Sequence, residues 1–275
     1  MREENLDKYD HLVRYFCGGF PDQLDFAESL LSSLGEVDIS NREHAFYAMY
    51  NEIHRLAGAA HCMGFRFVGK ALSEVVDRLD NLLSLSEPEM QIELLLCRHK
   101  VHAIAGLAER IRPENSYLFR QERESALEQV IFSEEEMEVI ANQRVLFADD
   151  DTFTRLLLQD YLQKIGVGAV QLAISGKEAL SAFKSFSPTI VIADWNMPPL
   201  DGMGLLQLVR SGQTKVDTDV SFIFLSTHNS FPKIKDAMRL NIDQFIMKPF
   251  TMEVVANAIR KSIQKQDINA AARAG

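Results

Sequence analysis

The sequence predicts two domains: an all-α helical bundle, followed by an α/β domain with a doubly wound, five-stranded parallel sheet. Residues 1–112 show helical periodicity and no strand-like alternation, whereas from residue 143 short apolar runs alternate with amphipathic segments. A chain of 275 residues is long enough for each half to bury its own core. We therefore expect two separate hydrophobic cores.

Glycine and proline residues divide the N-terminal half into helices. These helix-breaking residues are Gly18-Gly19, Pro21, Gly35, Gly64 and Pro88. The helices expected between them span 5–18, 22–34, 42–64, 67–84 and 88–111. Helices of this length, joined by short loops, are typical of a bundle.

The third helix carries the most informative pattern. An apolar stripe repeats at spacings of three and four residues and consists of Phe46, Met49, Ile53, Leu56, Ala60 and Met63. At about 100° per residue, His54, Gly58 and His61 lie roughly 130° from the centre of that stripe. This position predicts a solvent-facing His54. Because Gly58 has no side chain, it lets another molecule approach the imidazole closely.

Residues 54–64 resemble the phosphoacceptor motif of histidine phosphotransfer (HPt) domains. That family has a lysine three positions after its histidine, and glycines four and ten positions after it. Gly58 and Gly64 match, whereas Ala57 replaces the lysine. The resemblance implies that His54 carries a phosphoryl group, and Ala57 removes a charge that would steady that group.

Other interpretations of the histidines remain open. His54 is also compatible with a plain surface histidine, and the charge missing at Ala57 could come from Arg55, His61 or Lys70. We expect His61 to be a solvated neighbour of the site. The histidines that show no ligand spacing, and that we interpret as structural or solvated, are His44, His99 and His102.

Residues 113–142 are expected to form a partly helical, acidic linker. Pro113 ends the last bundle helix, residues 119–131 have helix-forming composition, and Ser133 begins a capping sequence for a further short helix. Such a connection is semi-rigid and differs from a flexible tether.

The second domain is predicted over residues 143–266, with 267–275 as a frayed tail and no further output domain. Its strands are expected near 145–149, 169–173, 189–194, 220–226 and 243–247. Its helices are expected near 152–165, 175–186, 201–211, 231–240 and 251–265. This alternation implies a parallel sheet with right-handed crossovers.

Polar side chains follow four of these strands. They are Asp149 and Asp150 after the first strand, Asp194 after the third, Ser226 after the fourth and Lys248 after the fifth. The carboxyl ends of parallel strands form the ligand-binding edge of an open α/β sheet. Clustered carboxylates suit Mg²⁺, and a hydroxyl and an ammonium beside them suit phosphoryl transfer onto a carboxylate. One such aspartate alone is more often a turn residue, but the four strand ends together favour a site.

This set resembles the receiver domain of bacterial response regulators. Separations of 44, 32 and 22 residues between Asp150, Asp194, Ser226 and Lys248 leave room for the strand and helix pairs of that fold. The resemblance implies a flavodoxin-like, CheY-like receiver. It also implies that Asp194 accepts the phosphoryl group, that Ser226 donates a hydrogen bond to it, and that Lys248 pairs with it.

The resemblance further implies a magnesium site and a switch. Asp150, Asp194 and the backbone carbonyl of Asn196 are the implied ligands of Mg²⁺, and Asp149 assists through water. Phe245, three residues before the lysine, occupies the position of an aromatic residue that changes rotamer on phosphorylation in receivers.

Composition narrows the functional class. Hydrophobic residues at 47% and charged residues at 25% are those of an ordinary soluble protein without a membrane span, so a cytoplasmic location is expected. Residues 1–118 hold 12 basic and 19 acidic residues, and residues 143–275 hold 15 and 13. This balance argues against nucleic-acid binding. Cys17, Cys62 and Cys97 predict reduced core thiols.

The combined prediction is a two-component phosphorelay protein. Its receiver takes a phosphoryl group on Asp194, and His54 exchanges phosphoryl groups with a receiver aspartate. A sensor or hybrid histidine kinase supplies the phosphate, since no kinase nucleotide motif is visible; other receiver domains or an effector are further partners. The semi-rigid linker favours exchange with a separate receiver. The alternative is a bundle that is a degenerate, non-phosphorylated docking or dimerisation module, as Ala57 suggests.

Overall fold

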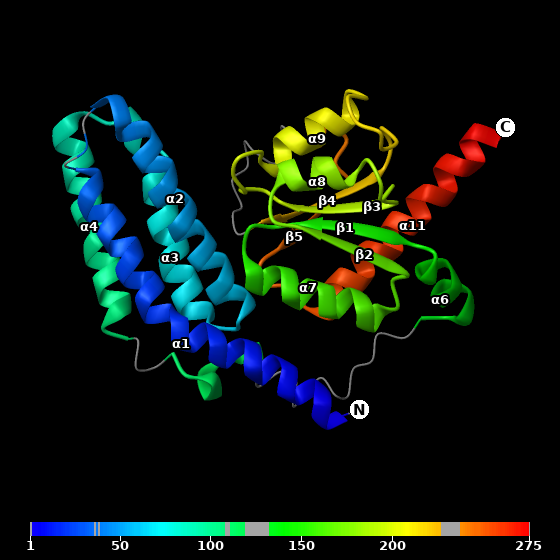
Figure 1. Cartoon of the computed structure of the whole chain (residues 1–275), viewed down its shortest axis with the longest axis horizontal. Coiled ribbons are helices and arrows are strands. Elements are labelled where there is room, and N and C mark those ends of the chain that lie inside the picture. Colours follow the sequence, from blue (N-terminus) through cyan, green and yellow to red (C-terminus); the bar gives the residue numbers. More distant parts are fainter. Residues whose placement is uncertain are drawn as a thin grey trace. The chain divides into compact units, whose positions relative to one another are not determined.

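The computed structural model describes residues 2–35, 37, 39–107, 111–118, 132–226 and 237–274. The chain divides into two compact units, Met1–Leu127 and Glu128–Gly275. The first unit is helical and the second contains the sheet (Figure 1). No helix within the described ranges is long and apolar enough to cross a membrane.

Four long helices make up most of the described part of the first unit. They are α1 (Arg2–Leu34), α2 (Ile39–Cys62), α3 (Arg66–Leu79) and α4 (Glu87–Ala105). Helices α1 and α3 each pack against both α2 and α4, so the four close into a bundle. A short 3₁₀ turn, η1 (Leu82–Ser84), lies between α3 and α4, and a second one, η3 (Pro113–Asn115), follows α4. The three cysteines are free thiols; Cys62 and Cys97 are buried, as predicted, whereas Cys17 is half-buried.

Helix α1 is continuous, although the sequence predicts a break near Pro21. Phe16, Phe20 and Leu24 follow one another at four-residue spacing, and all three are buried. The ring centroids of Phe16 and Phe20 lie 5.2 Å apart. Burial of large apolar side chains on both sides of the proline offsets the hydrogen bond that the proline removes, so the helix continues through it.

Helices α3 and α4 end earlier than predicted. The first stops at Leu79 and the second at Ala105, where the sequence pattern extends to 84 and 111. Each stop precedes residues of low helix propensity, Asp80-Asn81 and Gly106.

Residues 111–118 fold back onto the turn between α2 and α3. Ser116 Oγ donates a hydrogen bond to the carbonyl of Met63 at 2.6 Å, and the Tyr117 N–H donates to the carbonyl of Gly64 at 2.9 Å. Gly64 has a φ of +82°, and a Cβ there would lie 2.3 Å from the backbone nitrogen of Leu118. Only glycine fits this position, and the start of the predicted linker is therefore part of the bundle.

The second unit is a five-stranded parallel sheet with the order β2-β1-β3-β4-β5. The strands are β1 (Arg144–Ala148), β2 (Ala169–Ala173), β3 (Ile190–Asp194), β4 (Ser221–Ser226) and β5 (Gln244–Met247). The helices are α7 (Thr152–Ile165), α8 (Gly176–Ala182), α9 (Gly202–Arg210) and α11 (Met252–Ala274). Helices α8 and α9 cover one face of the sheet, and α7 and α11 cover the other (Figure 1). The fold is the predicted doubly wound sheet.

Several segments differ from the prediction or lie outside the described residues. Helix α11 continues to Ala274, where the sequence pattern predicts an end near 265. The expected helix at 119–131 lies outside the described residues, as does the part of the expected helix at 231–240 that precedes residue 237.

Helix α6 (Glu134–Ala141) belongs to the second unit. Its predicted capping box is present, because Ser133 and Glu136 exchange hydrogen bonds between side chain and backbone. Arg260 Nε of α11 donates to Glu136 Oε1 at 2.7 Å, which ties α6 to the second unit.

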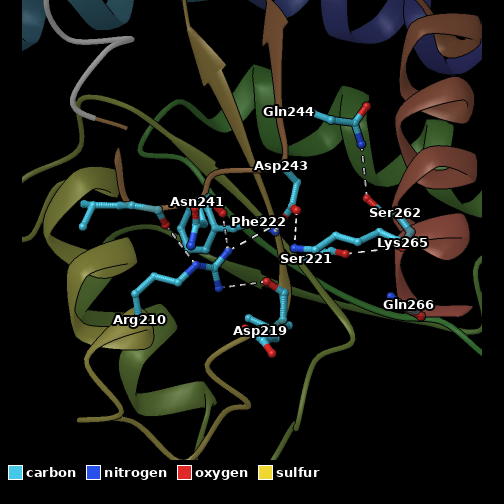
Figure 2. A network of polar contacts seen from close by, with 12 residues as sticks. Arg210, Asp219, Ser221, Phe222, Asn241, Asp243, Gln244, Ser262, Lys265 and Gln266 are labelled. Atoms are coloured by element: carbon cyan, nitrogen blue, oxygen red, sulfur yellow. Dashed lines mark hydrogen bonds and ion pairs between the residues drawn. The ribbon is translucent and has the colours of Figure 1, made fainter. Parts of the chain in front are cut away.

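A polar network fixes the amino-terminal edge of β4 and β5 (Figure 2). Asp243 Oδ2 accepts a hydrogen bond from the Phe222 N–H at 2.6 Å and lies 3.5 Å from Arg210 Nη2. The Lys265 ammonium pairs with the other oxygen of Asp243. Arg210 also donates to the carbonyls of Thr218, Val220, Leu240 and Asn241. This network holds α9 and α11 to the sheet, at the edge opposite the predicted site.

Candidate functional site

The carboxyl ends of four strands meet at one edge of the sheet. Strands β1 and β4 flank β3, and Asp194 at the end of β3 pairs in register with Leu225, one residue before Ser226. Asp149 follows β1 directly, and Lys248 follows β5 directly. The parallel sheet thus gathers four strand-end side chains that the sequence singled out, and all four are buried.

The ammonium of Lys248 lies between two carboxylates. Its Nζ is 2.8 Å from Asp149 Oδ2 and 2.7 Å from Asp194 Oδ1, and the lysine side chain is only 3% exposed. The Lys248 N–H also donates to the carbonyl of Ser226 at 2.8 Å. Loss of one partner would leave a buried charge uncompensated, so these three groups depend on one another.

Each carboxylate is also held by its own loop. Asp149 Oδ1 accepts from the Asp151 N–H at 2.9 Å, and Asp194 Oδ2 accepts from the Asn196 N–H at 2.9 Å. Asp194 Oδ1 is buried and accepts no hydrogen bond of good geometry from the described residues, so its contact with Lys248 is an ion pair only. One oxygen of Asp194 is therefore oriented by the backbone, and the other retains accepting capacity.

Burial sets the protonation of the acidic cluster. Burial raises the pKa of Asp149 to about 6; the charge of Asp194 adds to this, and the Lys248 ammonium opposes it. Burial and the charges of Asp149 and Asp194 raise the pKa of Asp150 to about 8. Both shifts disfavour the ionised carboxylates, so a proton or a cation bound at the cluster would stabilise it.

The donor set fits Mg²⁺. Asp150 and Asp194 offer carboxylate oxygens and Asn196 a backbone carbonyl. In both Asp149 and Asp194, one oxygen contacts Lys248 and the other accepts from a loop N–H. Among the described residues, no three His, Cys, Asp or Glu side chains gather in an arrangement ready for a metal ion. A cation here would thus keep several waters beside two carboxylates, as Mg²⁺ usually does. Asp194 Oδ1, which accepts no hydrogen bond of good geometry from the described residues, keeps a lone pair for that role.

The third acid of the run serves the helix. Asp151 Oδ2 accepts from the Thr154 N–H at 2.7 Å and from Thr154 Oγ1 at 2.8 Å, which caps α7. Sequence reasoning missed Arg155, whose Nη1 donates to the carbonyl of Asp149 at 2.6 Å. The sequence feature that could have identified Arg155 is its place in the first turn of a helix that begins just after a strand.

Three aromatic rings connect the end of β3 to β5. The Phe245 ring lies 5.9 Å from Trp195, with an interplanar angle of 19°, and 5.7 Å from Phe224. Phe224 and Phe245 are register partners on β4 and β5, and Trp195 follows Asp194 directly. The sequence identified Phe245 but not its stack on Trp195, because that contact depends on the alignment of three strands.

His54 is buried, so the prediction that it faces solvent is wrong. It is 5% exposed, and Ala57, at the position of the family's lysine, is 1% exposed. The imidazole lies parallel to the Tyr50 ring at 6.2 Å. The reason is that α2 packs against both α1 and α3, so a face 130° away from one apolar stripe is covered by a second neighbour.

The face of α2 that carries His54 contacts α3. Tyr50, at one end of it, donates a hydrogen bond to Asp80 Oδ1 at 2.7 Å. His61, at the other end, has Nε2 3.3 Å from Ser73 Oγ. His61 is therefore packed against α3, where a solvated side chain was predicted. His44, His99 and His102, which the sequence predicts to be structural or solvated, are exposed.

Comparison with known proteins assigns the second unit. Residues 145–260 match the family model of the response regulator receiver domain. The chain is 32% identical over 120 residues to the chemotaxis protein CheY of Bacillus subtilis (strain 168). The aligned residues make up 44% of this chain and 97% of that protein. It is 33% identical over 124 residues to a probable chemotaxis protein CheY of Rhizobium etli, and the aligned residues make up 45% of this chain and 94% of that protein.

Among solved structures, the receiver domain of the Francisella response regulator 1452 is 26% identical, with a TM-score of 0.41, and covers 46% of this chain and 99% of that one. The residues that match the family model lie within the second unit and include all five strands of the sheet except Arg144, the first residue of β1. Through residues 145–260, this chain belongs to the family of response regulator receiver domains.

Proposed function

We propose that Asp194 accepts a phosphoryl group from the phosphohistidine of a sensor or hybrid histidine kinase. A carboxylate oxygen of Asp194 attacks the phosphorus atom, and the P–N bond of the donor breaks. The electron pair of that bond returns to the donor imidazole, which takes up a proton, and an acyl phosphate remains on Asp194. The observation that carries this proposal is the Lys248 ammonium within 2.8 Å of two buried carboxylates.

The other residues of the site stabilise the charge that develops during transfer. Lys248 neutralises a phosphoryl oxygen, and the Ser226 hydroxyl donates a hydrogen bond to another. Asp150, Asp194 and the Asn196 carbonyl would hold Mg²⁺, with Asp149 assisting through water. When bound, Mg²⁺ supplies positive charge beside the phosphoryl group. Receiver domains generally interact with histidine kinases and with downstream effectors, and we propose the same two classes of partner here.

Phosphorylation by acetyl phosphate in the presence of Mg²⁺ tests the acceptor. The wild type should gain one acid-stable, base-labile phosphoryl group, and Asp194→Asn should gain none. Asp201→Asn is the matched control, because Asp201 caps α9 with Oδ1 at 2.7 Å from the Gly204 N–H and asparagine caps helices equally well. Equal labelling of Asp194→Asn and the wild type would refute the assignment.

A second candidate function concerns the bundle. The HPt-like motif around His54 supports phosphoryl exchange with a receiver aspartate, and we keep this as a proposal. The burial of His54 and Ala57 favours the alternative, a docking or dimerisation module that carries no phosphate while α2 and α3 stay paired. Exchange through His54 would require that this pair open.

Incubation with a phosphorylated receiver separates the two interpretations. If His54 is an acceptor, the chain should acquire an acid-labile phosphoryl group that His54→Gln abolishes and that His44→Gln, at an exposed histidine of the same helix, leaves intact. No labelling of the bundle at any temperature at which it remains folded would establish the non-phosphorylated module.

A further inference from the structure

Helix α4 is apolar on two opposite faces. One face is buried in the bundle and consists of Met90, Leu94, Cys97, Val101 and Ile104. The other face, called here the outer stripe, carries four exposed apolar residues and one exposed histidine between them: Ile92, Leu95, Leu96, Ala103 and His99. Spacings of three and four residues place the outer stripe within about 100° of arc. A helix that is apolar on both sides is expected to be buried on both sides.

The outer stripe exposes large aliphatic side chains. Ile92 is 59% exposed, Leu95 52% and Leu96 41%. Three of the charged residues beside it also form ion pairs within the bundle: Glu93 pairs with Arg78 of α3 at 2.9 Å, Lys100 pairs with Glu74 of α3, and Glu87 pairs with Arg42 of α2 at 2.7 Å. Adjacent exposed aliphatic residues on one helix face mark a contact surface more often than isolated ones do.

The charges along α4 change sign halfway. Acidic residues occupy its first half and basic residues its second half: Glu87, Glu89 and Glu93, then Arg98, Lys100 and His102. At about 100° per residue, both flanks of the outer stripe follow this order, with Glu89 and Glu93 before Lys100 on one side and Glu87 before Arg98 and His102 on the other. A parallel partner with the same sequence would place like charges together, and an antiparallel partner would place opposite charges together.

We propose that two copies of this chain associate through α4, antiparallel, about a two-fold axis near Leu95 and Leu96. The two aliphatic stripes then bury each other, and the acidic half of each helix faces the basic half of its mate. Such an isologous contact uses one patch twice and closes on itself. It requires no phosphoryl chemistry in either domain, so it can fail or succeed independently of the role of Asp194.

Sedimentation equilibrium of the full chain, without Mg²⁺ or phosphodonor, tests the proposal. The wild type should show a monomer–dimer equilibrium, and Leu95→Glu should raise the dimer Kd by about tenfold or more, because it places a charge at the centre of the interface. Phe67→Glu is the matched control: Phe67 is 72% exposed on α3, outside the outer stripe, and its substitution should leave the Kd unchanged. Circular dichroism verifies that both variants fold.

Arg98→Glu provides a variant that removes no apolar surface, and it should also weaken the dimer, with an effect that shrinks at high salt. A wild type that stays monomeric at all concentrations overturns the proposal. A dimer whose Kd is unchanged by Leu95→Glu also overturns it. The same holds for a monomer in which residues 119–131 protect the outer stripe from hydrogen exchange.

Cysteine cross-linking tests the direction of the helices. At a rise of about 1.5 Å per residue, an antiparallel axis near Leu95 and Leu96 brings the two copies of residue 95 level and separates the two copies of residue 92 by roughly 10 Å along the helix. In a Cys17→Ser background, Leu95→Cys should therefore cross-link under mild oxidation much faster than Ile92→Cys. Equal or reversed rates would refute the antiparallel arrangement.

Discussion

Asp150, which we propose as a ligand of Mg²⁺, is the residue whose protonation should affect the stability of the fold most. Burial and the charges of Asp149 and Asp194 raise its pKa to about 8 in the folded protein, against about 3.9 for an unfolded chain. Between these two values the folded state binds a proton that the unfolded state lacks. The free energy of unfolding of the metal-free protein should therefore fall as the pH rises from about 4 to about 8.

The substitution Asp150→Asn should reverse this pattern. The variant removes the charge that burial penalises, so without metal at pH 8 its Tm should exceed that of the wild type, and near pH 4 the difference should be small. Mg²⁺ should raise the Tm of the wild type and have much less effect on the variant. Thermal melts at several pH values, with exposed Asp267→Asn as control, measure both effects. A wild-type Tm that responds neither to pH nor to Mg²⁺ would contradict the electrostatic argument.

Gly69 holds α3 close to α2. A Cβ at this position would lie 2.6 Å from His61 Cγ and 2.7 Å from two further atoms of that ring. Gly69→Ala should therefore lower the free energy of unfolding by about 1–3 kcal/mol through overpacking. Gly18→Ala is the matched control: nothing lies within 4 Å of a Cβ there, so alanine should stabilise α1 by about 0.5–1 kcal/mol. Urea denaturation measures both, and equal effects would show that α2 and α3 are not tightly packed at this point.

At the scale of elements, strands were easier to predict than helices. Each strand lies within about one residue of its predicted bounds, because a buried parallel strand is a short run of β-branched and aromatic residues that ends at a polar residue. Helix α1 was divided wrongly because local breakers such as Pro21 were weighed without the burial of Phe20 and Leu24 around them. Packing on a neighbour decided the helix, and the local sequence does not contain that neighbour.

The rings of Trp195, Phe224 and Phe245 should report the state of Asp194. Because Trp195 is the only tryptophan, its fluorescence measures the environment of this stack directly. Addition of Mg²⁺ and beryllofluoride, a mimic of the phosphoryl group, should change that fluorescence in the wild type. Phe245→Leu removes the ring stacked on Trp195 and should reduce the change by more than half.

Phe186→Leu serves as the control for that experiment, because Phe186 lies beneath the guanidinium of Arg144 at the start of β1, far along the sheet from the acidic cluster. The same samples should show altered amide exchange in β5 on addition of beryllofluoride. If Phe245→Leu responds like the wild type, the stack does not couple the acceptor to β5.

For the whole molecule, the site at the strand ends could be predicted and the environment of His54 could not. Four polar strand ends imply proximity, because parallel strands share one carboxyl edge. The face of α2 that carries His54 gives no such constraint, since periodicity within one helix identifies one packed face and says nothing of a second neighbour. The same limit hid the contact of Ser116 with Met63, which joins segments that lie far apart in the sequence.

The two ends of the linker are each packed on one unit, and this constrains any exchange of a phosphoryl group between His54 and Asp194. Residues 111–118 pack on the bundle through Ser116, and α6 is tied to α11 through Arg260, so only residues 119–131 join the two anchored ends. Even as a random coil, a segment of that length would have a root-mean-square span of roughly 20 Å. Transfer within one chain then depends on one particular geometry, whereas transfer between chains does not.

We therefore expect phosphoryl transfer between His54 and Asp194, where it occurs, to be intermolecular. The measurement mixes a His54→Gln chain with an Asp194→Asn chain, phosphorylates one of them, and follows transfer at several dilutions. Transfer should slow in proportion to dilution, and Gly69→Ala in the chain that carries His54 should accelerate it, because a looser α2–α3 pair exposes the imidazole more often. Gly18→Ala in the same chain should leave the rate unchanged. Rapid, concentration-independent transfer in the wild type, with none between the two variants, would instead establish an internal relay and show that residues 119–131 bring the two sites together.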